Sequence, residues 1–366
     1  MRISLSRSDV TFSAAPDQSL LDAALGASLN LPHSCKGGNC GSCCARLLQG
    51  EIQYPNGPPL GLSEAEVADG FVLLCQARAR SDLRIETYEI TTPDQACIKR
   101  LPARIERALP LSHDVMGLFL RLPAAETFRF EAGQYIDIML PGGRRRSFSI
   151  ASPPHDARLL ELHVRRVAGG KFSDRLFDQA PRNALLAIEG PLGQFVYRPR
   201  VPTPDGPTPG IATPGAAPML LVGGGTGLAP LLSILRHVIE RGIERDMAIY
   251  WGVRSERDLY AHAALEDLAR RSPAAGRPAR LRYVPVLSEP SPDWRGPRGF
   301  VHEAVLEDID DLDKYDVYAA GPPAMIAAVR SEFGRRGVAA NRLFFDSFDY
   351  APDTLDRQRM SASTKS

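Results

Sequence analysis

Three patterns of apolar and polar positions follow one another along the chain, and each predicts a different kind of domain. Residues 3–32 and 63–86 contain short strand-like runs and a helical pattern that begins near Ser19, with its apolar side chains on one face. Residues 102–196 form alternating runs separated by Pro, Gly and Asp, which is typical of an antiparallel barrel. From residue 218 onward, continuous apolar runs alternate with helical patterns, which predicts a doubly wound parallel sheet.

The changes of pattern give the expected boundaries between parts of the chain. We predict a small α+β domain at 1–92, the barrel at 100–198 and the parallel α/β domain at 218–348. A Pro- and Gly-rich stretch at 199–217 has almost no apolar pattern and is expected to be an extended connector. The polar segment 349–366 is expected to be a disordered tail. The predicted fold class is therefore multidomain, with α+β and α/β parts.

Composition and charge exclude several classes of protein. The 366 residues are 44% apolar and 24% charged, as in ordinary globular proteins, and the formal net charge is +1. This balance offers no strong field for nucleic acid or for a basic partner. The N-terminal residues lack the apolar core of a signal peptide, and the most apolar stretch, Leu228 to Ile239, is too short to span a membrane. We expect a cytoplasmic monomer that binds neither nucleic acid nor membrane. Thiols stay reduced in that compartment, so clustered cysteines indicate metal there.

Four cysteines have the spacing of a metal cluster. Cys35, Cys40 and Cys43 follow the pattern C-x4-C-x2-C, and Cys75 comes after a gap of 31 residues. A [2Fe–2S] cluster needs four thiolates, and three close ligands with a distant fourth are the plant-type ferredoxin pattern. The alternative is a zinc site, which usually has two short C-x2-C-like pairs. The spacing favours the iron–sulfur cluster.

Glycines between these cysteines fit the same interpretation. Gly37, Gly38 and Gly41 allow backbone N–H groups to approach the bridging sulfides, and they allow turns with positive φ. Two cysteines are left over. Cys44 is expected to pack in the core, and Cys97 falls in a linker with no expected function.

Two segments resemble known families. Residues 1–90, with these cysteines and the strands and helix around them, resemble plant-type ferredoxins, which implies a β-grasp fold. In the barrel, the segment RSFSIAS is similar to the R-x-[YF]-S motif of the ferredoxin–NADP reductase superfamily, whose barrel binds a flavin. The resemblance implies that Arg146 holds the pyrophosphate, Phe148 covers the flavin and Ser149 hydrogen-bonds its reactive edge. On its own, the segment also fits an ordinary barrel strand.

A glycine turn before a helix adds to the expected flavin site. In the segment GGKFSDRLF, free backbone N–H groups lie at the positive end of a helix initiated by Ser173, which favours phosphate. On its own this pattern is also that of an ordinary capped helix. The family resemblance, which also covers LELHVR, assigns six residues of this region to the cofactor: His163, Val164, Gly170, Lys171, Phe172 and Ser173.

A glycine run, GGGTG from Gly223 to Gly227, follows the first strand of the parallel sheet. Ligands bind such sheets at the carboxyl ends of the strands. The run departs from G-x-G-x-x-G but is similar to the G-x-G-T-G-x-x-P pattern of the reductase superfamily. The later C-G-x-P motif of that superfamily has Ala320 in place of its cysteine. The resemblance assigns six residues to the nicotinamide nucleotide: Gly224, Gly225, Thr226, Arg254, Gly321 and Pro322.

The segment FFDSF near the C-terminus resembles the acidic-x-aromatic element that closes over the flavin in these reductases. Asp346 replaces the commoner Glu, and Phe348 is the expected aromatic residue. The alternative is a core strand with an exposed Asp346. The resemblance implies a catalytic centre formed by Ser149, Thr226 and Phe348.

The order of ferredoxin, flavin barrel and nucleotide domain resembles the reductases that feed bacterial oxygenases and those of CDP-6-deoxyhexose biosynthesis. A nicotinamide donates two electrons at once, whereas an iron–sulfur cluster accepts one, so a flavin between them can divide the pair. The resemblance implies electron flow from NADH, or NADPH, through FAD and a [2Fe–2S] cluster to a partner such as an oxygenase or dehydrase component. Two alternatives remain, a stand-alone flavin, quinone or iron reductase and a non-enzymatic redox sensor.

Overall fold

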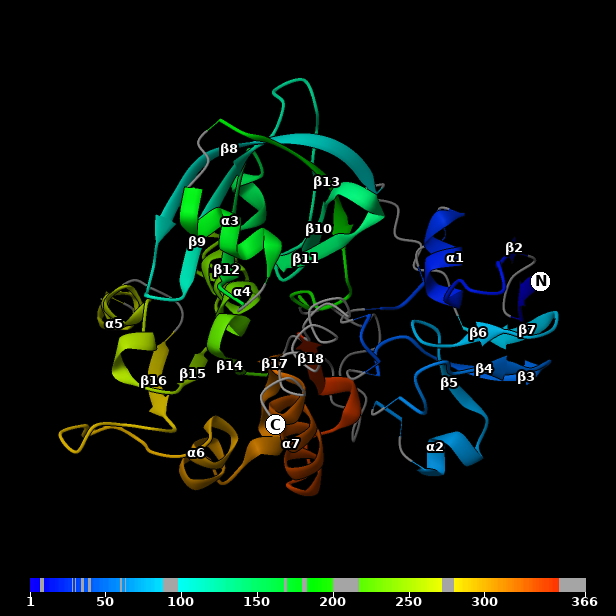
Figure 1. Ribbon diagram of the computed structural model, residues 1–366. Coiled ribbons are helices and arrows are strands. Elements are labelled where there is room, and N and C mark those ends of the chain that lie inside the picture. Colours follow the sequence, from blue (N-terminus) through cyan, green and yellow to red (C-terminus); the bar gives the residue numbers. More distant parts are fainter. Residues whose placement is uncertain are drawn as a thin grey trace, which may run out of the picture.

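The structure is a computed structural model that describes most of the chain. The described residues are 1–6, 10–27, 29, 31–33, 36–38, 41–59, 61–62, 64–87, 98–167, 170–179, 183–199, 217–271 and 280–348. Cys35, Cys40 and Cys97 lie outside the described residues, as do nearly all of the expected connector and the whole expected tail. The described chain forms three domains that lie against one another (Figure 1).

The N-terminal domain is a small sheet with a helix packed on it. Its five-stranded sheet has the order β2-β1-β7-β3-β5, and a separate ladder joins β4 to β6. The elements are β1 (Arg2–Leu5), β2 (Thr11–Ser13), α1 (Leu20–Gly26), β3 (Cys44–Gln49), β4 (Ile52–Gln53), α2 (Glu64–Ala68), β5 (Phe71–Leu73), β6 (Arg78–Ala79) and β7 (Leu83–Glu86). The Ser19 side chain accepts a hydrogen bond from the N–H of Asp22 and so begins α1. Leu20 and Leu21 bury the apolar face of α1 in the domain core, which completes the predicted β-grasp fold.

The second domain is an antiparallel barrel with the strand order β11-β10-β13-β8-β9-β12. An antiparallel bridge between Ile150 and Leu162 joins its two edges and closes the barrel. Leu118 and Leu120, two positions apart on one strand, both point into its core. The elements are β8 (Lys99–Pro110), β9 (Val115–Arg121), β10 (Tyr135–Met139), η1 (Pro141–Gly143), β11 (Arg145–Ser149), η2 (Pro154–Asp156), β12 (Leu159–Arg165), α3 (Lys171–Gln179) and β13 (Leu185–Leu192).

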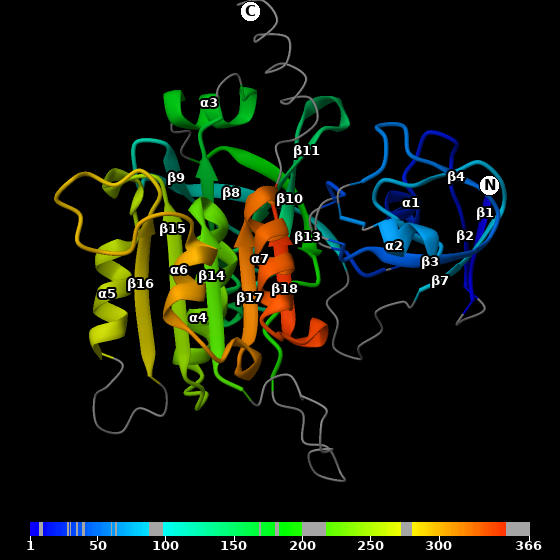
Figure 2. The ribbon, with the colours of Figure 1, turned by 90° about the horizontal axis from the view of Figure 1, so that it is seen from below.

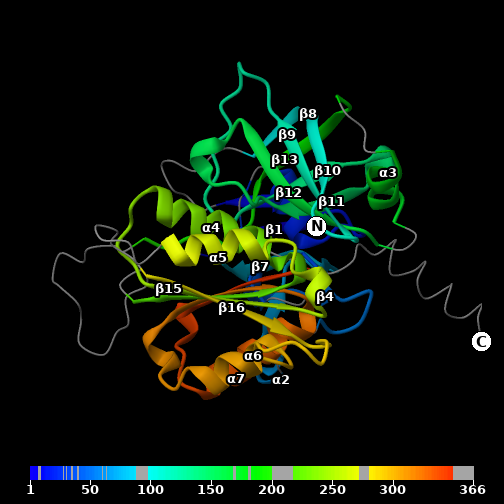
Figure 3. The same ribbon diagram turned by 90° about the vertical axis from the view of Figure 1, so that its left-hand side faces the viewer.

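The third domain is a parallel sheet with the order β16-β15-β14-β17-β18. Helices α4 and α5 cover the face toward the barrel, and α6 and α7 cover the other face (Figure 3). Leu221 packs into the core on the first face and Leu220 into the core on the second, which is why these strands are apolar throughout. The elements are β14 (Met219–Gly224), η3 (Gly225–Gly227), α4 (Leu228–Glu240), β15 (Met247–Val253), η4 (Glu256–Asp258), α5 (His262–Arg271), β16 (Leu281–Leu287), α6 (Val301–Asp308), η5 (Leu312–Lys314), β17 (Asp316–Gly321), α7 (Pro323–Arg335), η6 (Ala340–Arg342) and β18 (Leu343–Ser347).

The N-terminal domain lies beside both of the other domains, next to β10 and β11 of the barrel and near β18 of the parallel sheet (Figures 1 and 2). The carbonyl oxygen of His33 accepts a hydrogen bond from the N–H of Gln194 at 3.0 Å. On the other side, Nη1 of Arg330 in α7 lies 3.5 Å from the carbonyl oxygen of Gly61. Among the described residues, none of the helices is long and apolar enough to cross a membrane.

Candidate active site

A large cavity lies where the three domains meet. Its volume is about 1010 Å³, which is at the upper end of the range of about 300–1,000 Å³ for small-molecule sites. The N-terminal domain contributes Lys36, Gly37 and Gln76 to its wall. The barrel contributes β11, the end of β12 and the start of α3, and the third domain contributes the carboxyl ends of β14, β15 and β18 and the start of α7. The cavity is therefore a shared feature of the whole fold.

The cavity brings together most of the predicted cofactor residues. The following line it: Arg146, Phe148, Ser149, His163, Val164, Gly170, Phe172, Ser173, Gly224, Gly225, Thr226, Arg254, Pro322 and Phe348. Gly321 is not part of this lining, and its carbonyl oxygen accepts a hydrogen bond from the N–H of Phe348 at 3.0 Å. Lys171 begins α3, and its side chain lies outside the described structure. Residues from widely separated motifs thus surround one volume.

Strand β11 forms the wall that fits a flavin ring. Phe148 packs against Phe172 of α3, with the ring centroids 5.7 Å apart. The hydroxyl of Ser149 donates a hydrogen bond to Oδ2 of Asp346 at 3.3 Å. Asp346 is only 2% exposed, so the alternative of an exposed Asp346 is wrong. An aromatic pair beside a buried hydroxyl and carboxylate suits a planar ring with a hydrogen-bonding edge.

The turn before α3 fits a pyrophosphate. The Ser173 hydroxyl accepts a hydrogen bond from the N–H of Val167 and donates one to the carbonyl oxygen of Gly170, both at 3.1 Å. A Cβ at Gly170 would lie 2.6 Å from Oγ of Ser173, so the tight turn requires glycine. Arg146 lines the same cavity, and its charge suits an anion next to a helix N-terminus. The residues of this wall and turn fit FAD.

The glycine turn η3 lets the carboxyl ends of β14 and β17 approach closely. A Cβ at Gly227 would lie 2.0 Å from the carbonyl oxygen of Ala320, and one at Gly224 would lie 2.7 Å from Sδ of Met325. A larger residue at Gly227 would push the turn away from β17, and one at Gly224 would collide with the start of α7. Thr226 lies on the cavity wall formed in this way. The edge between these strands fits a nicotinamide nucleotide, because ligands of such sheets bind there.

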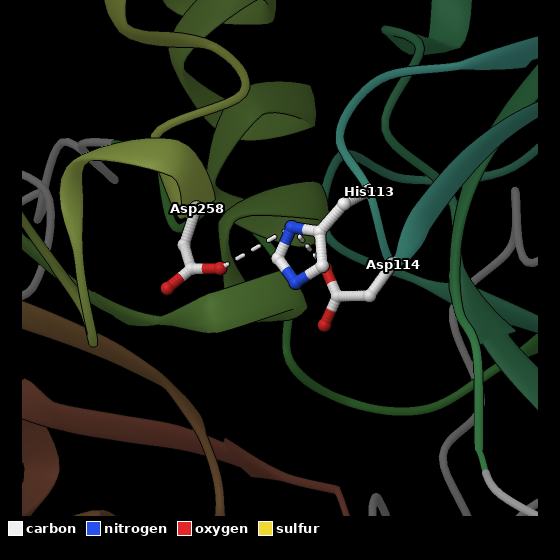
Figure 4. A group of neighbouring side chains, drawn as sticks. All are labelled: His113, Asp114 and Asp258. Atoms are coloured by element: carbon white, nitrogen blue, oxygen red, sulfur yellow. Dashed lines mark ion pairs between the residues drawn. The ribbon is translucent and has the colours of Figure 1, made fainter.

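The turn after β15 presents Arg254 to the cavity. The N–H and the hydroxyl of Ser255 both donate hydrogen bonds to Oδ2 of Asp258 at 2.9 Å. The other carboxylate oxygen of Asp258 lies 3.7 Å from Nδ1 of His113, which also lies 3.9 Å from Asp114. Figure 4 shows the His113 ring between the two carboxylates. His113 and Asp114 belong to the hairpin between β8 and β9, so this contact joins the barrel to the third domain.

A network of buried polar side chains next to the cavity also joins the barrel to the third domain. Nδ1 of His163 lies 3.0 Å from the Tyr260 hydroxyl, and Nε2 lies 3.1 Å from Oε1 of Glu161. Arg236 of α4 donates to Oε2 of Glu161 at 2.5 Å. Burial by itself would raise the pKa of Glu161, but the hydrogen bond with His163 and the charge of Arg236 lower that pKa to about 2. This network therefore holds the cavity-lining His163 ring in a fixed orientation.

The two described cysteines of the expected cluster are buried and adjacent. Cys43 is 3% exposed and Cys75 is 8% exposed, and the N–H of Leu74 donates to the carbonyl oxygen of Cys43 at 3.1 Å. Gly38 and Gly41 have φ values of 80° and 76°, which are the positive values predicted for this loop. Two buried thiols beside these glycine turns fit an iron–sulfur cluster.

Comparisons with known proteins assign a family to each domain. The family model of a 2Fe-2S iron-sulfur cluster binding domain matches residues 3–80. An oxidoreductase FAD-binding domain matches residues 102–197, and an oxidoreductase NAD-binding domain matches residues 221–331. The three matches follow the order of the three structural domains.

A named reductase matches nearly the whole chain. The CDP-6-deoxy-L-threo-D-glycero-4-hexulose-3-dehydrase reductase of Yersinia pestis is 36% identical over 348 residues, which cover 95% of this chain and 98% of that protein. The chain belongs to this family of iron–sulfur flavoprotein reductases. It is an NAD(P)H-dependent oxidoreductase that passes electrons through FAD and a [2Fe–2S] cluster to a partner protein.

Two further similarities cover all three domains of the reductase. The reductase subunit of an aromatic O-demethylase from Amycolatopsis is 37% identical, over 91% of this chain and 94% of that protein. The crystal structure of an Amycolatopsis cytochrome P450 reductase matches with a TM-score of 0.72 and 34% identity, over 95% of this chain and 99% of that one. The likeness therefore includes the order and the folds of the domains.

Sequence motifs did not indicate the residues that join the N-terminal domain of the reductase to the flavin wall. Lys36, Gln76 and Tyr135 line the cavity but are not among the residues that the motifs assign to the cluster or to a cofactor. Lys36 has a φ of 52°, which is unusual for a residue with a side chain. The nearest signal is its place directly after Cys35, but no local pattern shows that a lysine there meets a barrel strand.

Proposed function

We propose that this reductase accepts hydride from NADH and delivers single electrons to an oxygenase or a dehydrase component. The observation that supports this most directly is the cavity, whose wall combines predicted flavin residues, predicted nucleotide residues and the loop next to Cys35. Donor, flavin and cluster sites then adjoin within one chain. Both partner classes have support in the relatives, which are named as reductases of a dehydrase and of an aromatic O-demethylase.

The cavity residues have complementary roles in the proposed reaction. FAD, when bound, supplies the exchange between the electron pair of the nicotinamide and the single electrons of the cluster. Arg146 and the turn at Gly170 hold the pyrophosphate with positive charge and backbone donors. Ser149 places its hydroxyl at the reactive edge of the ring, and Asp346 fixes that hydroxyl through the hydrogen bond at 3.3 Å. Phe348 covers the ring and excludes water.

The turn after β15 favours NADH over NADPH. Arg254 is expected to meet the adenine ribose, and Thr226 the nicotinamide end. The N–H and the hydroxyl of Ser255 are already engaged by Asp258, so they are not available to bind a 2′-phosphate. We expect a higher kcat/KM for NADH, and we expect Arg254→Ala to lower kcat/KM for both nucleotides alike. A loss confined to NADPH would contradict this preference.

The variant Cys43→Ser separates the relay from a stand-alone flavin reductase. Loss of a buried cluster ligand should remove the [2Fe–2S] cluster but leave FAD binding and its reduction by NADH intact. We expect the variant to reduce small two-electron dyes at the normal rate and to lose transfer to a one-electron protein acceptor. The matched control is Cys44→Ser, because Cys44 begins β3 and packs against the domain core. Full transfer to the protein acceptor by Cys43→Ser would instead support the stand-alone reductase.

We further propose that the reductase acts as a monomer in the cytoplasm. The described residues of a single chain already form a cavity with walls from all three domains, and cysteine ligands of a cluster suit a reducing compartment. Sedimentation of the loaded protein at the mass of a dimer would contradict the monomer.

A further inference from the structure

Asp137 is a buried carboxylate where the barrel meets the N-terminal domain. It lies in the middle of β10, and its side chain is 1% exposed. Nζ of Lys36 lies 3.2 Å from Oδ2 of Asp137, and Nη1 of Arg145 lies 3.5 Å from the same oxygen. Ser147 donates a hydrogen bond to Oδ1 at 2.6 Å. Both oxygens are engaged, and one of the two cations belongs to another domain.

Lys36 connects this carboxylate to both parts of the cluster site. It follows Cys35 directly, and its carbonyl oxygen accepts a hydrogen bond at 2.9 Å from Nε2 of Gln76, which is the neighbour of Cys75. The Lys36 side chain is 20% exposed, and its Nζ lies 5.7 Å from the centre of the Tyr135 ring. Lys36, Gln76 and Tyr135 all line the cavity. The ion pair therefore lies between the loop that carries Cys35 (the cluster loop) and the cavity wall formed by β11 (the flavin wall).

We propose that Lys36 and Asp137 are positioning residues that lock the cluster loop onto the flavin cavity and so set the rate of electron transfer from flavin to cluster. This inference rests on the proposed function. Removing Lys36 leaves the buried Asp137 carboxylate with only cationic partners of its own domain, such as Arg145, and removing Asp137 takes away the carboxylate that holds Lys36. Either change loses the ion pair that joins the two domains, so the pair favours the docked arrangement. Electron transfer slows steeply with distance, and a loosely held loop spends less time in the productive geometry.

The charge of Lys36 also has an effect that is separate from docking. A positive charge beside a cluster stabilises the reduced cluster and raises its reduction potential. Neutralising Lys36 should therefore lower the potential as well as loosen the loop. Neutralising Asp137 removes a negative charge instead, so it loosens the loop without lowering the potential. Asp137→Asn thus separates position from potential.

The test compares two rates in the holoenzyme variants Lys36→Met and Asp137→Asn. Anaerobic mixing with excess NADH gives the rate of flavin bleaching by absorbance, and freeze-quench EPR gives the rate of cluster reduction. We expect flavin bleaching at the rate of the unmodified protein and cluster reduction slowed by about tenfold or more in both variants. The double variant should be no slower than the slower single variant, because one interaction is lost in each case. Lys36→Arg, which keeps the charge, should restore cluster reduction.

The matched control is the ion pair between Lys99 and Glu126, which has a similar N···O distance of 3.0 Å but whose side chains are 37% and 43% exposed. Lys99→Met should leave both rates unchanged. The proposal would be overturned if cluster reduction slowed only in Lys36→Met and in proportion to a lower cluster potential. Normal rates of cluster reduction in both variants would also overturn it. Equal slowing of bleaching and cluster reduction would also overturn it. If Lys36→Met does not assemble its cluster, Asp137→Asn decides, because Asp137 lies in the barrel. Failure of NADH to reduce the cluster in the unmodified protein would instead reject the proposed function.

Discussion

At the scale of single residues, the contact between Ser149 and Asp346 is the most specific feature of the flavin wall. The Ser149 hydroxyl donates its proton to a buried carboxylate, so its oxygen is held as an oriented acceptor at the cavity wall, and such fixed dipoles act strongly where water is excluded. We expect Ser149→Ala to slow NADH-driven flavin bleaching by about 10²-fold while FAD content stays normal. Stopped-flow absorbance of the loaded protein measures the rate, and the flavin released on denaturation measures the content.

The control for this variant is Ser233→Ala. Ser233 is fully buried in α4, and its hydroxyl donates to the carbonyl oxygen of Ser152 at 2.8 Å, outside the cavity. The substitution Ser233→Ala removes a buried hydrogen bond without changing any residue of the flavin wall. Equal rates in Ser149→Ala and the unmodified protein would show that Ser149 has no part in the chemistry.

Sequence offers specific predictions for individual residues where one short segment defines the chemistry. The C-x4-C-x2-C spacing identifies the cluster cysteines because metal ligation demands several thiolates in one loop. Arg146, Phe148 and Ser149 are recognisable because one strand carries all three. The pair Lys36 and Asp137 was not predictable, because the partners are 101 positions apart and meet only when two domains pack.

At the scale of elements, Glu161 ties β12 of the barrel to α4 of the third domain. Its pKa of about 2 lies below the ordinary value of 4.5, so its charged form stabilises the folded protein. The contribution of the Glu161 charge to the free energy of unfolding is complete above about pH 4.5, and it is lost as the pH falls toward 2. The shift corresponds to about 3 kcal/mol. We therefore expect Glu161→Gln to lower the free energy of unfolding by about this amount at pH 7.

Urea unfolding followed by the fluorescence of the buried Trp251 measures this change in the third domain. The difference between Glu161→Gln and the unmodified protein should shrink below pH 4.5 and nearly vanish close to pH 2. The control is Glu126→Gln, whose carboxylate forms an exposed ion pair and should contribute less than about 1 kcal/mol. A difference that is the same at pH 3 and pH 7 would contradict the role of the Glu161 charge.

Local sequence patterns predicted some of the helices and strands better than others. The strands of the parallel sheet are continuously apolar because both faces are covered by helices, so their order of strand and helix was predictable. The barrel strands were recognisable from alternation, but the bridge from Ile150 to Leu162 that closes the barrel was not. Closure depends on strand twist and packing over the whole sheet, which no single segment encodes.

At the scale of the whole molecule, the function depends on the cavity that the three domains form together. The order of the domains could be predicted from sequence, because each has its own motif. Their packing could not, since it depends on single contacts between domains, such as Arg330 with the Gly61 carbonyl and His113 with Asp258. The walls of the cavity come from all three domains, so disturbing a contact between domains should affect transfer between sites more than binding at one site.

The central claim is that electrons from NADH reach the cluster through the flavin within one chain. Anaerobic addition of NADH to the loaded protein, followed by absorbance and EPR, tests this claim most directly. The account predicts that the flavin absorbance bleaches and that the rhombic EPR signal of a reduced [2Fe–2S] cluster then appears. Complete bleaching of the flavin in a protein with a full complement of iron and sulfide, with no cluster signal, would contradict it.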